Sequence, residues 1–105
     1  MRLSLVIPTL GRQAVVYNVL RHFEHQSRPP DEVVVVDQTE ARDARLEEYA
    51  AAHPSVRYVR IEEKGLPNAR NVGVRRSTGD VVLFIDDDVV PDADLVRRHV
   101  ENYED

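Results

Sequence analysis

Three consecutive aspartates, Asp86–Asp88, directly follow the apolar run Val81–Ile85. In an extended backbone alternate side chains share a face, so Asp86 and Asp88 are expected to point one way and Asp87 the other. Two carboxylates about 6 Å apart repel each other by roughly 2–3 kcal/mol at an effective dielectric constant near 20, and a divalent cation reverses that sign. Carboxylate oxygens suit Mg²⁺ and Mn²⁺, so the triplet is a candidate metal site. The alternative is a solvated acidic turn that stabilises the next helix.

A second polar segment, Gly65–Gly73, is expected to form a turn that opens a helix, with Pro67 in the first helical turn. Arg70 offers a planar, permanently charged group to a phosphate or carboxylate, and Asn71 stands beside it. An ion pair between Arg70 and the aspartate triplet is the structural alternative. Both interactions can hold in different ligand states.

Smaller polar groups follow two other apolar runs. Asp37 ends the run Val33–Val36, where it can accept hydrogen bonds from a ribose or base, or form a local turn with Thr39. Pro8 and Thr9 end the first run and offer a rigid turn, a hydroxyl and backbone groups. These residues are candidates for ligand binding, with ordinary turn formation as the alternative.

The elements that must position these groups alternate along the chain. The predicted strands are Leu3–Ile7, Val33–Val36, Val56–Ile61 and Val81–Ile85. The predicted helices cover the stripe from Val15 to Phe23, Ala41–Ala52, Asn68–Ser77, and a last segment from Asp92 as N-cap to about Tyr103. Regular alternation predicts an α/β fold with a mostly parallel, four-stranded sheet. The carboxyl ends of parallel strands meet at one edge, so the polar groups above are expected to converge there.

Composition excludes several classes of function. The 105 residues carry a net charge of −5, divided into +2 over residues 1–79 and −7 over residues 80–105, which argues against a nucleic-acid partner. The absence of cysteine excludes disulfide scaffolds, zinc–thiolate sites and thiol catalysis. No Walker loop or Gly-x-Ser-x-Gly elbow occurs, so a glycine phosphate cradle and a serine hydrolase are not supported. No secretory signal is visible, and a cytoplasmic location is expected.

Four motifs in order resemble the family 2 glycosyltransferases, which have the GT-A fold. They are Val6–Thr9, Val33–Asp37, Asn68–Gly73 and Gly79–Asp88, and together they extend over essentially the whole chain. The resemblance implies that residues 1–105 form a single nucleotide-sugar-binding domain, the Rossmann-like half of that fold. It also implies that Asp86 and Asp88 hold Mn²⁺ or Mg²⁺, which bridges the donor diphosphate, with Asp88 as the principal ligand.

The resemblance further implies a set of residues that bind the sugar donor: Pro8, Thr9, Asp37, Arg70, Asn71, Asp86 and Asp87. Of these, Pro8, Thr9 and Asp37 match positions that line the nucleoside pocket. The next residue, Gln38, stands where the family often has a second acidic residue that helps to read uracil. An amide at this position can also form hydrogen bonds with a base.

Family members run to well over twice this length, so the chain is expected to be a fragment that lacks the acceptor site and the catalytic base. The implied reaction of the complete enzyme is an inverting displacement at the anomeric carbon of a nucleoside-diphosphate sugar, and the complete protein is a candidate for membrane association. The surface that truncation exposes makes a homodimer a second candidate partner. Two alternatives remain: a non-catalytic nucleotide-binding or interaction domain of the same fold, and a Mg²⁺-dependent phosphoacceptor-type domain.

Overall fold

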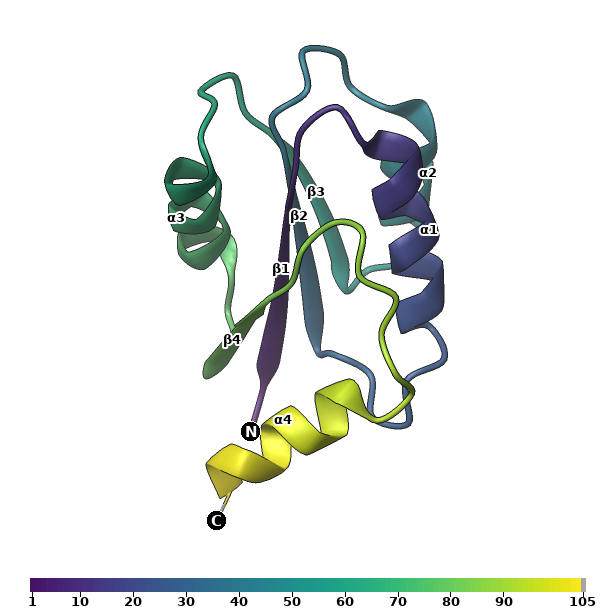
Figure 1. Cartoon of the computed structure of the whole chain (residues 1–105), viewed down its shortest axis with the longest axis vertical. Coiled ribbons are helices and arrows are strands. Elements are labelled where there is room, and N and C mark those ends of the chain that lie inside the picture. The colour runs from purple at the N-terminus through teal and green to yellow at the C-terminus, as the bar shows by residue number, and fades with distance from the viewer. Residues whose placement is uncertain (105) are drawn as a thin grey trace.

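The chain folds into a four-stranded parallel sheet with helices on both faces (Figure 1), and the computed structural model describes residues 1–104. The elements are β1 (Leu3–Thr9), α1 (Gln13–Phe23), β2 (Glu32–Asp37), α2 (Ala44–Ala52), β3 (Val56–Arg60), α3 (Leu66–Arg76), β4 (Val81–Phe84) and α4 (Leu95–Glu104). The predicted alternation of strands and helices is confirmed. No helix within residues 1–104 has both the length and the apolar character needed to cross a membrane.

The strand order across the sheet is β3-β2-β1-β4, and every neighbouring pair is parallel. From β1 the chain moves outward through β2 to β3, and it then crosses to the other side of β1 to form β4. The direction of winding therefore reverses between β1 and β4. In open α/β sheets ligands bind outside the carboxyl ends of the strands at such a reversal. The ends of β1 and β4 are therefore the part of the sheet where a site is expected.

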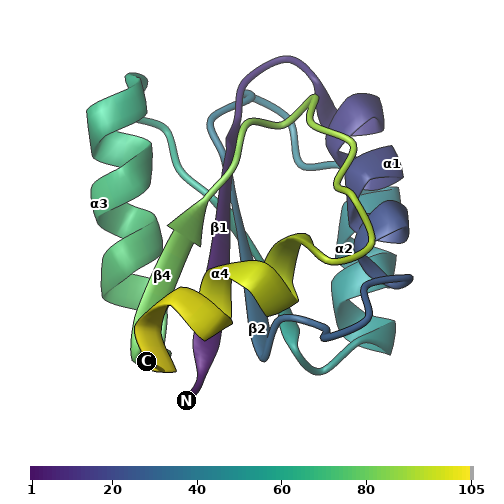
Figure 2. The ribbon, with the colours of Figure 1, turned by 60° about the horizontal axis from the view of Figure 1, so that its bottom comes forward.

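The helices form layers on the two faces of the sheet. Figures 1 and 2 show α3 on one face, α1 and α2 on the other, and α4 beside the N-terminus. Leu5 and Ile7 of β1 belong to the larger core with α1, α2 and α4, whereas Val6 packs with Ala69 of α3. Residues on both faces of β1 are thus buried, which explains why the run is apolar without alternation.

The close packing of α3 on the sheet depends on a glycine. A Cβ atom at Gly73 would overlap the buried side chain of Val6. Any larger residue would push α3 away from β1 and open the smaller core. Gly73 therefore belongs to the packing of the sheet rather than to the polar edge.

Several element boundaries differ from those predicted. Helix α2 begins at Ala44 rather than Ala41, because the carboxylate of Asp43 accepts a hydrogen bond from Leu46 N at 3.0 Å and caps the helix. Helix α4 begins only at Leu95, because its first helical backbone bond runs from Arg98 N to Asp94 O at 2.9 Å, and Asp92 belongs to the turn before it. Helix α3 begins two residues earlier than predicted, and β4 is one residue shorter.

Candidate functional site

A cleft of about 390 Å³ lies at the carboxyl ends of β1 and β4, where the winding reverses. It is lined by Pro8, Thr9, Leu10, Arg12, Gln38, Gly65, Leu66, Asp86, Asp87 and Asp88. These residues come from the end of β1, from the loops after β1, β2, β3 and β4, and from the first residue of α3. The predicted convergence of polar groups at one edge of the sheet is therefore confirmed for these four loops.

The acidic triplet is fixed to the end of β1. Along the β1–β4 pair each residue of β4 lies opposite the residue 78 positions earlier, from Leu3↔Val81 to Val6↔Phe84. The same offset joins Thr9 to Asp87 beyond the end of the ladder, where the Thr9 hydroxyl donates a hydrogen bond to Asp87 Oδ2 at 2.8 Å. Sheet register thus places the triplet beside the β1 loop.

The exposure of the three aspartate side chains alternates as expected, but their contacts do not follow the alternation. Residues 87 and 88 form a turn rather than extended strand, and Val89 N donates to Asp86 O at 3.3 Å. As a result Asp87 Oδ1 and Asp88 Oδ2 lie on the same side, each 3.3 Å from Nη1 of Arg12. Asp87 is the inner group, with its side chain 12% exposed against 59% for Asp88. Asp86 is also exposed, so Asp86 and Asp88 are the carboxylates open to solvent.

Gln38 is a buried part of the cleft wall. Its Nε2 donates to Glu63 O at 3.0 Å and to Gly65 O at 2.9 Å, which fastens the loop before α3 to the end of β2. A primary amide nitrogen has two hydrogens, and both are used in these bonds. Oε1 is therefore the only part of the Gln38 amide that remains for a ligand.

Asp37 lies beneath the loops and is fully buried. Its carboxylate accepts hydrogen bonds from Gln13 Nε2 at 2.8 Å, from the Tyr58 hydroxyl at 2.6 Å and from Thr39 N at 2.9 Å. Burial, together with the hydrogen bond to Asp37, raises the pKa of Tyr58 to about 12, so the phenol is a donor at neutral pH. The Thr39 hydroxyl in turn accepts from Gly11 N at 2.8 Å. Asp37 thus holds the β1 and β2 loops in place, and its direct contact with a nucleoside stays a prediction.

Three predicted donor-binding residues lie outside the cleft lining, namely the buried Asp37 and, on α3, Arg70 and Asn71. Arg70 and Asn71 are exposed on α3, and the Arg70 guanidinium lies over the Phe84 ring, 5.7 Å from its centroid. Within the described residues Arg70 forms no ion pair with the aspartate triplet. A role for Arg70 and Asn71 beside the donor stays a prediction.

Sequence reasoning missed three cleft residues, Leu10, Arg12 and Leu66. The two leucines are large apolar side chains that are 47% and 45% exposed, and small-molecule sites combine such apolar surface with a few polar groups. Arg12 could have been singled out as a cation in the loop after the first strand, at the same sheet edge as the triplet. Its pairing with Asp88 could not, because the pairing depends on the turn at residues 87 and 88.

The carboxylate oxygens of the acidic turn suit a divalent cation that takes its remaining ligands from a bound substrate and from water. Among residues 1–104 no three His, Cys, Asp or Glu side chains are placed to hold a metal ion by themselves. Mg²⁺ typically uses one or two protein carboxylates and completes its shell with waters and substrate phosphates. The exposed carboxylates of Asp86 and Asp88 fit that pattern.

A family model described as Glycosyl transferase family 2 matches residues 4–105. An uncharacterized glycosyltransferase of Bacillus subtilis, YfnE, is 30% identical over 99% of this chain and 27% of its own length. An uncharacterized glycosyltransferase of Haemophilus influenzae is 36% identical over 82% of this chain and 29% of its own length. The chain thus spans less than a third of the length of these two relatives.

Solved structures show the same fold. The mannosyltransferase PcManGT of Pyrobaculum calidifontis, in complex with GDP-Man and Mn²⁺, superposes with a TM-score of 0.85 at 28% identity, over 99% of this chain and 32% of that one. TarS 1–349 of S. aureus superposes with a TM-score of 0.82 at 23% identity, over 99% of this chain and 32% of that one. The family match over residues 4–105 shows that the chain belongs to glycosyl transferase family 2.

Proposed function

We propose that the cleft binds the nucleoside-diphosphate part of a sugar donor together with Mn²⁺ or Mg²⁺ at Asp86 and Asp88. The observation that carries the proposal is the acidic turn fixed to the end of β1, at the winding reversal and beside a cleft of about 390 Å³. The complex of PcManGT with GDP-Man and Mn²⁺ supports it, since that protein shares the fold at 28% identity.

The cleft offers a different surface to each part of such a donor. Leu10 and Leu66 provide apolar surface for the flat base, and Gln38 Oε1 is an acceptor for an N–H group at its edge. The exposed carboxylates of Asp86 and Asp88 on the acidic side of the cleft would hold a divalent cation beside the diphosphate. A divalent ion there stabilises negative charge on the departing nucleoside diphosphate. Thr9 holds the acidic turn in position, and the Arg12 guanidinium lies beside it.

The proposal assigns donor binding, and not the whole reaction, to residues 1–105 as a single nucleotide-sugar-binding domain. The matched relatives and structures are more than three times as long as the aligned chain, so the acceptor site and the base that deprotonates the acceptor are assigned to other parts of a complete enzyme. For that enzyme we propose inverting sugar transfer, in which the acceptor hydroxyl displaces the nucleoside diphosphate. A homodimer stays a prediction.

Calorimetric titration of the chain with GDP and UDP, as a purine and a pyrimidine diphosphate, tests donor binding. In MnCl₂ at least one of them is expected to bind at least about tenfold more tightly than in EDTA, because the cation neutralises the repulsion between carboxylates and diphosphate. Inorganic phosphate is the control for the nucleoside part. Equal binding with and without metal would contradict the proposal, and so would Mn²⁺-dependent binding without preference over phosphate, which favours a phosphoacceptor-type domain.

A further inference from the structure

We infer that Arg12 is a counter-ion that prevents the acidic turn from binding a divalent cation by itself, so that cation and nucleoside diphosphate bind together. The inference rests on the proposed function and adds a mechanism of coupling between the two ligands. In this mechanism the Arg12 guanidinium leaves the aspartates and pairs with the diphosphate when the nucleotide binds.

Arg12 occupies the point at which a cation would be drawn to the turn. Its Nη1 lies 3.3 Å from Asp87 Oδ1 and 3.3 Å from Asp88 Oδ2, so a single nitrogen bridges the two carboxylates. Within residues 1–104 no other basic side chain forms an ion pair with the triplet. The bridge includes Asp88, one of the two exposed carboxylates that are proposed as metal ligands.

A positive charge at this point opposes binding of a second cation. The guanidinium neutralises one of the three carboxylate charges, and it repels a divalent ion that approaches the same oxygens. At about 5 Å, a unit charge and a divalent ion repel strongly enough to weaken binding by at least about tenfold, even at the dielectric constant of water. In the absence of nucleotide the turn is therefore expected to bind Mn²⁺ weakly.

A diphosphate provides the guanidinium with another partner. Arg12 lines the same cleft as Asp86–Asp88, and its side chain is 54% exposed, so burial does not hold it in its present position. Guanidinium groups form paired, charge-assisted hydrogen bonds with phosphate oxygens. When Arg12 turns to the diphosphate, Asp88 is released. Asp87 still accepts its hydrogen bond from the Thr9 hydroxyl, so the turn stays in place.

This exchange makes the two ligands cooperative. Each ligand strengthens the other by the same factor, because the coupling between two binding equilibria is reciprocal. If Arg12 served only as a structural strut for the turn, its loss would loosen the turn and weaken Mn²⁺ binding. The counter-ion role predicts the opposite sign, namely tighter Mn²⁺ binding when the charge is removed.

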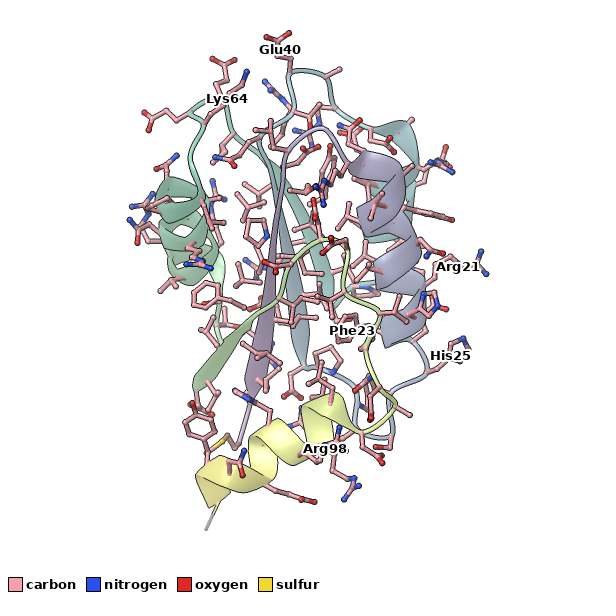
Figure 3. All side chains as sticks on the ribbon, viewed as in Figure 1. Arg21, Phe23, His25, Glu40, Lys64 and Arg98 are labelled. Atoms are coloured by element: carbon pink, nitrogen blue, oxygen red, sulfur yellow. The ribbon has the colours of Figure 1, made fainter. Side chains whose placement is uncertain are left out.

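The experiment measures free Mn²⁺ by its paramagnetic resonance signal, without nucleotide and with saturating GDP or UDP. We expect the Arg12→Gln chain to bind Mn²⁺ without nucleotide about tenfold more tightly than the unchanged chain. The factor by which nucleotide increases the affinity for Mn²⁺ is expected to be about tenfold smaller in this variant. Arg12→Lys keeps the charge and is expected to retain most of that enhancement. The matched control is Arg98→Gln, because Arg98 is 56% exposed and pairs with Asp92 at 3.1 Å. Figure 3 shows Arg98 on α4, at the opposite end of the molecule from the loops that carry Glu40 and Lys64.

Two results would overturn the inference. One is Mn²⁺ affinity without nucleotide that is unchanged or weaker in a folded Arg12→Gln chain, with folding checked by circular dichroism. The other is an Arg12→Lys chain that binds Mn²⁺ without nucleotide as tightly as the Arg12→Gln chain, since the positive charge at position 12 would then have no effect on Mn²⁺ binding. If the unchanged chain shows nucleotide-enhanced Mn²⁺ binding in these experiments, only the role of Arg12 fails. If it shows none, the proposed function fails with it.

Discussion

Asparagine in place of both Asp86 and Asp88 is expected to weaken Mn²⁺-dependent binding of a nucleoside diphosphate by about a hundredfold. The substitution keeps the size of both side chains and removes two negative charges from the exposed part of the acidic turn. Asp87 retains its hydrogen bond with Thr9 and its contact with Arg12, so the turn itself is expected to persist. Calorimetric titration in MnCl₂ measures the loss directly.

A second pair of aspartates provides a control with the same spacing. Asp92 and Asp94 precede α4, and neither lines the cleft. The double substitution to asparagine at these positions changes net charge by the same amount and is expected to leave Mn²⁺-dependent nucleotide binding within about twofold. Equal losses in the two double variants would mean that overall charge, rather than a site at the end of β4, accounts for binding. Retained binding in the Asp86, Asp88 variant would contradict the assignment of the metal ligands.

Alanine in place of Glu32 is expected to lower the free energy of unfolding by about 3 kcal/mol, a large share of the roughly 5–15 kcal/mol typical of a domain. Glu32 begins β2 and is 3% exposed. Its carboxylate accepts hydrogen bonds from Thr78 N at 2.7 Å and Ser4 Oγ at 2.9 Å, and pairs with Arg57 at 3.2 Å. Loss of the carboxylate leaves partners on β1, on β3 and in the loop before β4 unsatisfied. Urea unfolding measures the change, with the 88% exposed Glu62 as the control position.

The same carboxylate makes stability depend on pH. Burial alone would raise the pKa of Glu32, but the hydrogen bonds from Thr78 and Ser4 and the charge of Arg57 outweigh burial and lower the pKa below 4.5. A group with a lowered folded-state pKa stabilises the fold above its unfolded value, and that stabilisation is lost as pH falls through the folded value. Glu32→Gln is therefore expected to show a smaller loss of stability below about pH 4.5 than the unchanged chain. An identical acid profile for the two chains would contradict this account of Glu32.

Much of the fold follows from apolar patterning. Unbroken runs such as Val33–Val36 predict strands buried on both faces, and β2 is buried along its whole length. The partly alternating run at Val56–Ile61 predicts a strand near an edge, and β3 is the outer strand next to β2. Helix ends were less predictable, because capping by Asp43 depends on one side-chain rotamer and not on a repeating pattern.

The position of the site in the fold could be predicted from the sequence, but most of the contacts between its side chains could not. Parallel topology alone brings Thr9 and the aspartate triplet together, since the offset between β1 and β4 extends beyond the ladder. The shared contact of Asp87 and Asp88 with Arg12 was not predictable, because a period of two applies to strands and the triplet lies partly in a turn. Burial of Asp37 under Gln13 and Tyr58 likewise depends on long-range packing. The metal, the nucleotide, and roles for Arg70 and Asn71 stay predictions.

The most direct test locates a bound ion on the sequence. Mn²⁺ added at a small fraction of the protein concentration, with saturating GDP or UDP, broadens amide NMR signals near its binding site. We expect the strongest broadening at Thr9 and Asp86–Asp88, and far less at Arg98, which does not line the cleft and lies on α4 (Figure 3). Broadening centred instead on His22 of α1 and His25 just after it, neither of which lines the cleft, would contradict the central claim that the acidic turn after β4 holds the cation.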